Sequence, residues 1–244
     1  MTTAADVKRL RTQTGQVATL TRRALDAYWA TLDLSDPAAA RDALLDFVPT
    51  LTARYGDVAA TVAADWYTDV RGKQVRGRYR PALADSPADV AVAESVRYHA
   101  GHLFDGTAPM ALAGIGAAAV RYVANTARDT IAVNVRRDPS KPRWARVPSG
   151  GRTCAWCTLL ASRGFVYLSE ETADGGGYHD DCTCTAVADW SDDPRIDGYD
   201  PAGMYALYAE ARDSDIGGND DRSIAAAMRR LHPDLFTDGV HTHA

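Results

Sequence analysis

All four cysteines of the chain, together with one histidine, fall in one short window of the sequence. The window reads Cys154-x-x-Cys157 and, later, His179-x-x-Cys182-x-Cys184. Two thiolates separated by two residues can both turn toward one ion, and a second group from a distant loop then closes a tetrahedral zinc site. A site closed by four protein ligands holds a small module together and does no chemistry, so the spacing predicts structural zinc.

Two ligand sets stay open. Cys154, Cys157 and His179 with either Cys182 or Cys184 would give three thiolates and one imidazole. We favour this set, because His179 and Cys182 form a compact arm, whereas Cys182 and Cys184 could approach one ion together only with local distortion of a strand. The second set uses all four thiolates and leaves the histidine outside the ligands. The alternative to metal is four reduced cysteines packed as small apolar side chains, or disulfides such as Cys154 to Cys182.

The composition of the chain limits the classes of protein in which this cysteine window can occur. With 244 residues, 46% of them hydrophobic, the chain can bury a sizeable core without the help of disulfides. The net charge of -5 argues against a protein that coats nucleic acid through a basic excess. No early apolar run resembles a signal peptide, so we expect reduced cysteines, which metal explains better than disulfides. The longest low-charge run, Met110 to Val120, is too short to span a bilayer.

The residue content and the hydrophobic period of the sequence change near Pro139. Before it the chain is rich in Ala, Val and Leu with helical periodicity, and after it short apolar runs alternate with Gly, Pro, Asp and Trp. We therefore expect a mainly α protein with a small α+β zinc module. The helical bundle should cover 1–139, the zinc-binding module 140–190, and an acidic linker with a short helical tail 191–244.

Capping and proline signals predict the helices of the first part. The first helix ends near Leu34, and the second starts at Ser35-Asp36-Pro37, bends or breaks near Pro49 and reaches Tyr67. The next two start at Ser86-Pro87 and at Thr107-Ala108-Pro109, and the last of these runs to about Arg137.

Short elements are predicted for the second part. We expect strands at Arg143–Val147, Phe165–Tyr167 and Thr183–Ala188, and a short helix at Ala155–Ser162 that ends at Gly164. Two tail helices are expected, at Pro201–Arg212 and Arg222–Leu231.

The cysteine window also carries a resemblance to a known family. Its residues are Arg152-Thr153-Cys154-Ala155-Trp156-Cys157, Ala161-Ser162-Arg163-Gly164 and Tyr178-His179-Asp180-Asp181-Cys182-Thr183-Cys184. They resemble the C-terminal signature of MuF-type minor capsid, or head morphogenesis, proteins of tailed bacteriophages, especially phages of actinobacteria. The match covers residues from about 144 to 187, and the helical first half agrees in general character. The chain departs from the family at Asp180, where a proline is frequent, and at Thr183, where a basic residue is frequent.

The resemblance implies a virion protein that acts in procapsid assembly, in the host cytoplasm at first and then inside the head. The implied partners are the portal protein, the major capsid protein or packaged DNA, and no membrane. The long N-terminal helices would suit docking against partner helices, although the simpler interpretation of their apolar stripes is the core of the protein itself.

A run of basic residues offers a third interpretation, a zinc-stabilised nucleic-acid-binding module. Arg71, Lys73, Arg76, Arg78 and Arg80 could contact phosphates, with the neighbouring tyrosine available for stacking. The alternative for this run is a solvated linker between helices.

Proteins of this type are also named capsid maturation proteases, so a catalytic interpretation is open too. It needs a nucleophile such as Ser149 or Ser162, a base such as His99 or His179, and an acid such as Asp180. No G-x-S-x-G motif is present, and a histidine that coordinates zinc cannot accept a proton.

Metal-assisted hydrolysis is a further catalytic alternative. Glu170 and Glu171 could activate a metal-bound water if one ligand were absent. The H-x-E element of zinc deaminases is missing, since His179 is followed by two aspartates. The sequence therefore assigns no catalytic residue.

Overall fold

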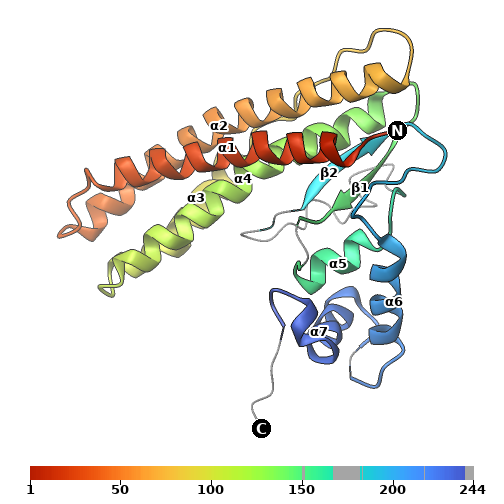
Figure 1. The fold of residues 1–244 in the computed structure, drawn as a ribbon. Helices are drawn as coiled ribbons and strands as arrows, with labels where there is room; N and C mark the ends of the chain where they lie inside the picture. The colour runs from red at the N-terminus through yellow and green to blue at the C-terminus, as the bar shows by residue number, and fades with distance from the viewer. Residues whose placement is uncertain (150–151, 167–181, 183, 217, 240–244) are drawn as a thin grey trace.

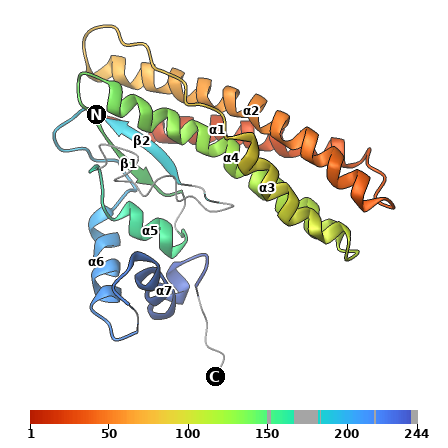
Figure 2. The same ribbon diagram turned by 180° about the vertical axis from the view of Figure 1, so that it is seen from behind.

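Three long helices form an elongated arm at one side of the molecule. In this computed structural model, which describes residues 1–149, 152–166, 182, 184–216 and 218–239, they are α1 (Ala4–Trp29), α2 (Pro37–Gln74) and α4 (Ala108–Arg137). The shorter α3 (Asp89–Ala100) and the 3-10 turn η1 (Gly101–Leu103) lie along the far half of the arm (Figures 1 and 2). The expectation of a mainly helical protein is confirmed.

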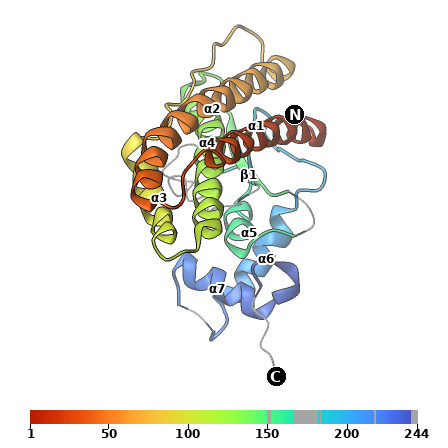
Figure 3. The same ribbon diagram turned by 90° about the vertical axis from the view of Figure 1, so that its left-hand side faces the viewer.

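The remaining elements lie against the other end of the arm (Figure 1). They are β1 (Arg143–Val147), α5 (Ala155–Ala161), β2 (Thr185–Asp189), α6 (Pro201–Arg212), α7 (Asp221–Leu231) and the 3-10 turn η3 (Pro233–Leu235). Viewed along the arm, the sheet and α5 lie beneath α1 and α4, with α6 and α7 beyond them (Figure 3). Among the described residues, no helix combines the length and hydrophobicity needed to cross a bilayer.

The second helix is longer and more regular than predicted. Asp36, rather than Ser35, caps α2 by accepting a hydrogen bond from the Ala39 amide at 3.0 Å. The helix continues through Pro49 and beyond Tyr67 to Gln74, so α2 is not broken at the proline and the expected end is wrong. An internal proline removes one backbone hydrogen bond, and the burial of α2 between α1 and α4 offsets that loss.

The third helix starts later than predicted. Ser86 does not cap it, because its hydroxyl donates to the Ala53 carbonyl at 3.3 Å and to Asp57 at 3.0 Å, both on α2. The helix begins at Asp89 without a side-chain cap. The loop before it is thus tied to α2, a tertiary contact that overrides the local Ser-Pro signal. The start of α4 at Ala108 and its end at Arg137 are confirmed.

The two strands pair in an antiparallel ribbon in which Arg143 faces Asp189 and Val147 faces Thr185. Both strands are almost fully buried, because α1 and α4 cover β2 and α5 packs against β1. The second expected strand, Phe165–Tyr167, is wrong for Phe165 and Val166, which are not in a strand, and Tyr167 lies outside the described residues.

One hydrophobic core joins the ribbon to the arm. It includes Trp66 and Tyr67 of α2, Ile131 of α4, Trp144 of β1 and Val187 of β2. A second core fills the far half of the arm between α1, α2, α3 and α4. The sheet therefore shares its packing with the helices, and the proposed division of the chain after residues 139 and 190 stays a prediction.

A buried ion pair fixes the point where the arm meets the ribbon. Asp138, which follows α4, accepts hydrogen bonds from Arg71 at 2.8 and 3.2 Å, from the Tyr67 hydroxyl at 3.1 Å and from Trp190 Nε1 at 3.0 Å. Asp138 Oδ1, which accepts the longer of the two Arg71 bonds, also accepts from the Ser140 amide at 2.9 Å. This Asp138 hub links α2, α4 and the segment after β2 through one carboxylate.

The C-terminal tail packs on α5. Leu159 and Leu160 of α5, Ile224 and Met228 of α7, and Phe236 form a separate apolar core. The expected tail helices are confirmed, with α6 at the predicted bounds and α7 starting one residue earlier. The tail thus helps to hold the helix that carries one half of the cysteine window.

Candidate metal centre

The Cys154-x-x-Cys157 segment folds as the start of α5. Cys154 is the N-cap residue, and its Sγ accepts a hydrogen bond from the Cys157 amide at 3.2 Å. Its carbonyl accepts from the Thr158 amide and hydroxyl at 3.0 and 3.1 Å. The two cysteines are therefore brought to the same end of the helix by ordinary capping geometry.

The C-terminal tail holds this Cys154-x-x-Cys157 segment in place. The Ala155 amide donates to Asp238 at 2.9 Å, and Asp238 also pairs with Arg229 of α7 at 2.6 Å. The Thr237 amide donates to the Thr153 carbonyl at 3.1 Å. The cysteines at the start of α5 are thus held by backbone contacts on the side away from the sheet.

The Cys182-x-Cys184 segment, here the second arm and distinct from the helical arm, reaches the same place from the start of β2. Cys157 Sγ and Cys182 Sγ are 3.4 Å apart, and the sulfur atoms of Cys157, Cys182 and Cys184 all lie within 4.8 Å of one another. Cys154 packs in the same cluster, and all four cysteines are free thiols. Disulfides within the window are therefore excluded in this structure.

The donor set fits a zinc ion. Zinc–sulfur bonds of about 2.3 Å at tetrahedral angles place neighbouring sulfur atoms about 3.8 Å apart. The three converging thiols meet this spacing to within about an ångström, and thiolates are ligands that zinc prefers. His179, Asp180, Glu170 and Glu171 lie outside the described residues. The identity of the metal and the choice between the two ligand sets stay predictions.

The thiols shift one another's pKa values because they are buried in contact with one another. Hydrogen bonds from Cys157 and Cys184 lower the pKa of the Cys182 thiol, and the Arg128 cation acts in the same direction. The pKa of Cys157 is raised, first because it donates to Cys154 and then because it faces Cys182 and Cys184. The ionisation of each thiol therefore depends on the protonation of its neighbours.

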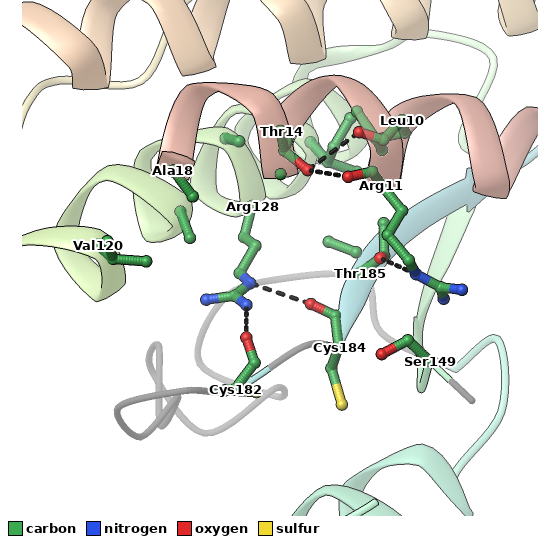
Figure 4. A pocket seen from close by; sticks show the side chains of 15 residues that line it. Leu10, Arg11, Thr14, Ala18, Val120, Arg128, Ser149, Cys182, Cys184 and Thr185 are labelled. Atoms are coloured by element: carbon green, nitrogen blue, oxygen red, sulfur yellow. Dashed lines mark hydrogen bonds between the residues drawn. The ribbon is translucent and has the colours of Figure 1, made fainter. Parts of the chain in front are cut away.

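Arg128 of α4 contacts the second arm and is a site residue that sequence reasoning missed. Its Nη2 donates to the Cys182 carbonyl at 2.6 Å and its Nε to the Cys184 carbonyl at 3.1 Å (Figure 4). The side chain is 8% exposed. A signal was present, because Arg128 follows Ala124 by four residues and precedes Ile131 by three, which places an arginine on the apolar face of the helix.

A cavity of about 430 Å³ opens beside the second arm, between α1 and α4 (Figure 4). Its walls are mostly apolar, and Cys182 and Cys184 form part of its lining. Arg11 of α1 lies at the opposite side and donates to the Pro148 carbonyl at 2.9 Å.

The proposed catalytic groups are scattered among the described elements. Ser149 lines the cavity. Ser162 follows α5 and donates its hydroxyl to the Leu159 carbonyl at 2.7 Å. His99 lies on α3, where its ring packs directly on Gly114 of α4. Since α3 and α5 lie in different parts of the molecule (Figure 1), Ser162 and His99 do not form a catalytic pair.

The structure separates the five basic candidates into two groups. Arg71 is buried in the Asp138 hub, and Lys73 donates to Asp6 at 2.7 Å. Arg76, Arg78 and Arg80 lie exposed in the loop after α2. Lys73 is exposed as well, with 59% of its side chain accessible, but its ammonium group is paired with Asp6.

Comparisons with known proteins give matches to bacteriophage proteins. A family model described as VG15 protein matches residues 1–211. The Gene 15 protein of Mycobacterium phage D29 is 46% identical over 82 residues, which are 32% of this chain and 28% of that protein. The Gene 15 protein of Mycobacterium phage L5 is 42% identical over 76 residues, or 27% and 26%. The matched part thus spans less than a third of the length of either relative. No solved structure matches.

Proposed function

The chain belongs to the VG15 protein family, and from this we propose that it is a minor capsid, or head morphogenesis, protein that acts in phage procapsid assembly. In this proposal it lies inside the head, near the portal or the packaged DNA, and contains one structural zinc ion. The relatives in two mycobacteriophages support a phage role. The cysteine window that resembles MuF-type proteins supports the assembly role.

The convergence of thiols from two segments is the observation that carries the proposal. Cys157 lies at the start of α5, whereas Cys182 and Cys184 lie just before β2. A zinc ion bound there would join α5 and the tail to the ribbon, and the ribbon is packed on the arm. Such an ion supplies stability rather than chemistry. A rigid module that presents a long helical arm suits assembly better than catalysis.

The far end of the arm offers a surface for a partner in the capsid. Tyr98 at the end of α3, Phe104 in the turn and Met110 at the start of α4 are 78%, 55% and 55% exposed. Aromatic residues and Met are enriched at protein–protein interfaces, and apolar side chains gathered at one end of a molecule are candidates for such a contact. We propose that this apolar tip, defined by these three residues, contacts the portal protein.

Co-purification with the cognate portal protein tests the assembly role. The full chain and a Tyr98→Ser/Phe104→Ser variant would be co-expressed with tagged portal protein, and the bound fraction measured after affinity purification. We expect retention of the unchanged chain and at least a tenfold loss for the variant, since two exposed aromatic anchors each contribute about 1 kcal/mol or more. A Tyr205→Ser variant on α6, where Tyr205 is 50% exposed, is the matched control.

Retention of the double variant at the level of the Tyr205 control would remove the apolar tip from the proposal. Failure of the unchanged chain to bind either portal or major capsid protein would contradict the assembly role itself.

The nucleic-acid alternative keeps a reduced form. Arg76, Arg78 and Arg80 are exposed in a loop, whereas Arg71 is buried and the exposed Lys73 is paired with Asp6. If the exposed loop binds duplex DNA, the logarithm of the affinity should fall with the logarithm of salt concentration with a slope no steeper than about -2.7, or 0.9 per phosphate. Replacing Arg76, Arg78 and Arg80 by glutamine should abolish that binding, whereas Lys73→Gln should leave the slope unchanged, as fluorescence anisotropy would show. A slope that Lys73→Gln reduces would mean that Lys73 leaves Asp6 to bind DNA.

The protease alternative is tested by incubating the chain with the cognate major capsid protein. We expect no cleavage, and no difference between the unchanged chain and a Ser149→Ala variant. Cleavage that disappears with Ser149→Ala would replace the structural proposal with an enzymatic one.

A further inference from the structure

The second arm brings two sulfur atoms together from residues that are two positions apart in the chain. In a regular strand, residues two apart are separated by about 6.7 Å along the chain. The sulfur atoms of Cys182 and Cys184 nevertheless lie within 4.8 Å of each other and of Cys157. The side chains of Cys182 and Cys184 therefore converge on Cys157.

The Arg128 guanidinium is placed to hold the backbone from which these side chains converge. One planar group donates to the carbonyls of both cysteines, with Nη2 at 2.6 Å from Cys182 and Nε at 3.1 Å from Cys184. The two carbonyl oxygens are thereby drawn toward a single point on α4. Figure 4 shows the Cys184 sulfur on the opposite side of its backbone from the guanidinium. The contact thus fixes the backbone and leaves the thiol directed away from the helix.

Arg128 is itself held rigidly. Its Nη1 donates to the Asn125 side chain at 2.8 Å, one turn earlier on α4, and its side chain is almost completely buried. A lysine could not reproduce this contact, because an ammonium group lacks the planar arrangement of donors that engages two acceptors at once. The guanidinium also places a positive charge beside groups that must become thiolates when metal binds.

We propose that Arg128 is a positioning residue that shapes the Cys182-x-Cys184 arm for metal binding and so couples the helical arm to the metal centre. This inference rests on the proposed zinc site and adds to it a residue from outside the cysteine window. By thermodynamic reciprocity, metal binding should strengthen the contact between α4 and the second arm as much as that contact strengthens metal binding.

Zinc affinity of the full chain, measured by competition with a chromophoric chelator, tests the proposal. Residues that orient metal ligands typically change affinity by about 10- to 100-fold when replaced, so we expect a loss of that size for Arg128→Met. Arg128→Lys keeps the charge but loses the double contact, and its affinity should also fall by about tenfold. Arg137→Met, an exposed arginine of the same helix, is the matched control and should bind as the unchanged chain does.

Cobalt substitution gives a second measurement that a general loss of stability would not mimic. Sulfur-to-cobalt charge-transfer absorption increases with the number of bound thiolates, and we expect the Arg128 variants to show less of it per bound ion. Circular dichroism would establish that each variant is folded, and Asn125→Ala, which loosens the guanidinium without removing it, would replace any variant that is not.

Each outcome decides a different point. Unchanged zinc affinity and cobalt spectrum in Arg128→Met would overturn the positioning role, and full retention by Arg128→Lys would show that charge alone matters and overturn it as well. If the unchanged chain binds no zinc or cobalt, the zinc centre of the proposed function fails first.

Discussion

Chelation of zinc should unfold α5 and the tail while the helical arm stays folded. The free energy of structural zinc binding is on the order of 10 kcal/mol, which is comparable with the whole stability of a domain. The arm has its own cores between α1, α2 and α4, whereas the core around Leu159, Leu160 and Met228 is small. Hydrogen exchange should show loss of protection in α5 and α7 and retained protection at Ala60 and Ala63 of α2.

A Cys157→Ser variant should reproduce the effect of chelation without a chelator. Cys157 is central to the cluster, since its sulfur is 3.4 Å from Cys182. Ser162→Ala, at the other end of the same helix, is the matched control and should lose no more than about 1.5 kcal/mol, the contribution of one hydrogen bond. A thermal unfolding profile of Cys157→Ser that coincides with that of the control would count against structural zinc.

Replacement of Asp138 by alanine should lower the free energy of unfolding by about 3–5 kcal/mol, because it leaves the Arg71 guanidinium buried without a counter-charge. Asp138 is 0% exposed and Arg71 is 5% exposed, so water cannot replace the lost partner. The Tyr67, Trp190 and Ser140 donors would lose their acceptor as well. Urea unfolding followed by tryptophan fluorescence would measure the change.

The exposed ion pair between Arg9 and Asp69 provides the control for this experiment. Its side chains are 38% and 53% exposed, so Asp69→Ala should cost no more than about 1 kcal/mol. Equal losses for Asp138→Ala and Asp69→Ala would show that the Asp138 hub does not fix the junction between arm and ribbon.

The Asp138 hub should also make stability depend on acid. Burial alone would raise the pKa of Asp138, but hydrogen bonds from Arg71, Ser140 and Trp190 outweigh burial and lower the pKa below its ordinary value of 3.8. A carboxyl group with a lowered pKa stabilises the fold above its ordinary value, and this contribution is lost as the pH falls below 3.8. The unchanged chain should therefore lose more stability in that range than Asp138→Asn.

Local signals in the sequence were enough to predict most elements. The Thr107-Ala108-Pro109 signal gave the start of α4, and Asp200 before Pro201 caps α6 at the predicted residue. The period of two in Arg143–Val147 gave β1. In each case the deciding interaction lies within a few residues of the signal, so no knowledge of tertiary contacts was needed.

Errors arose where a distant contact decides the outcome. Ser86 hydrogen-bonds to α2 instead of capping α3. Arg71 looked like part of a solvated connector, yet Asp138, more than sixty residues away, draws it into the interior. Val90 and Tyr98 of α3 are apolar yet exposed, because the helix packs on α2 and α4 through Val92, Val96 and Ala100.

The candidate site could be predicted only in part, because local motifs reveal some of its residues and distant contacts decide the others. Spacing identified Cys154, Cys157, Cys182 and Cys184, because metal ligands come in short local motifs. Arg128 was missed, because its role depends on α4 lying across the second arm, which no local pattern encodes.

Metal content of the purified chain tests the account most directly. Elemental analysis by mass spectrometry, combined with thiol titration before and after denaturation, should find about one zinc ion per chain and thiols that react only after the metal is released. A fully folded, metal-free chain whose four thiols all react without metal release would contradict the account.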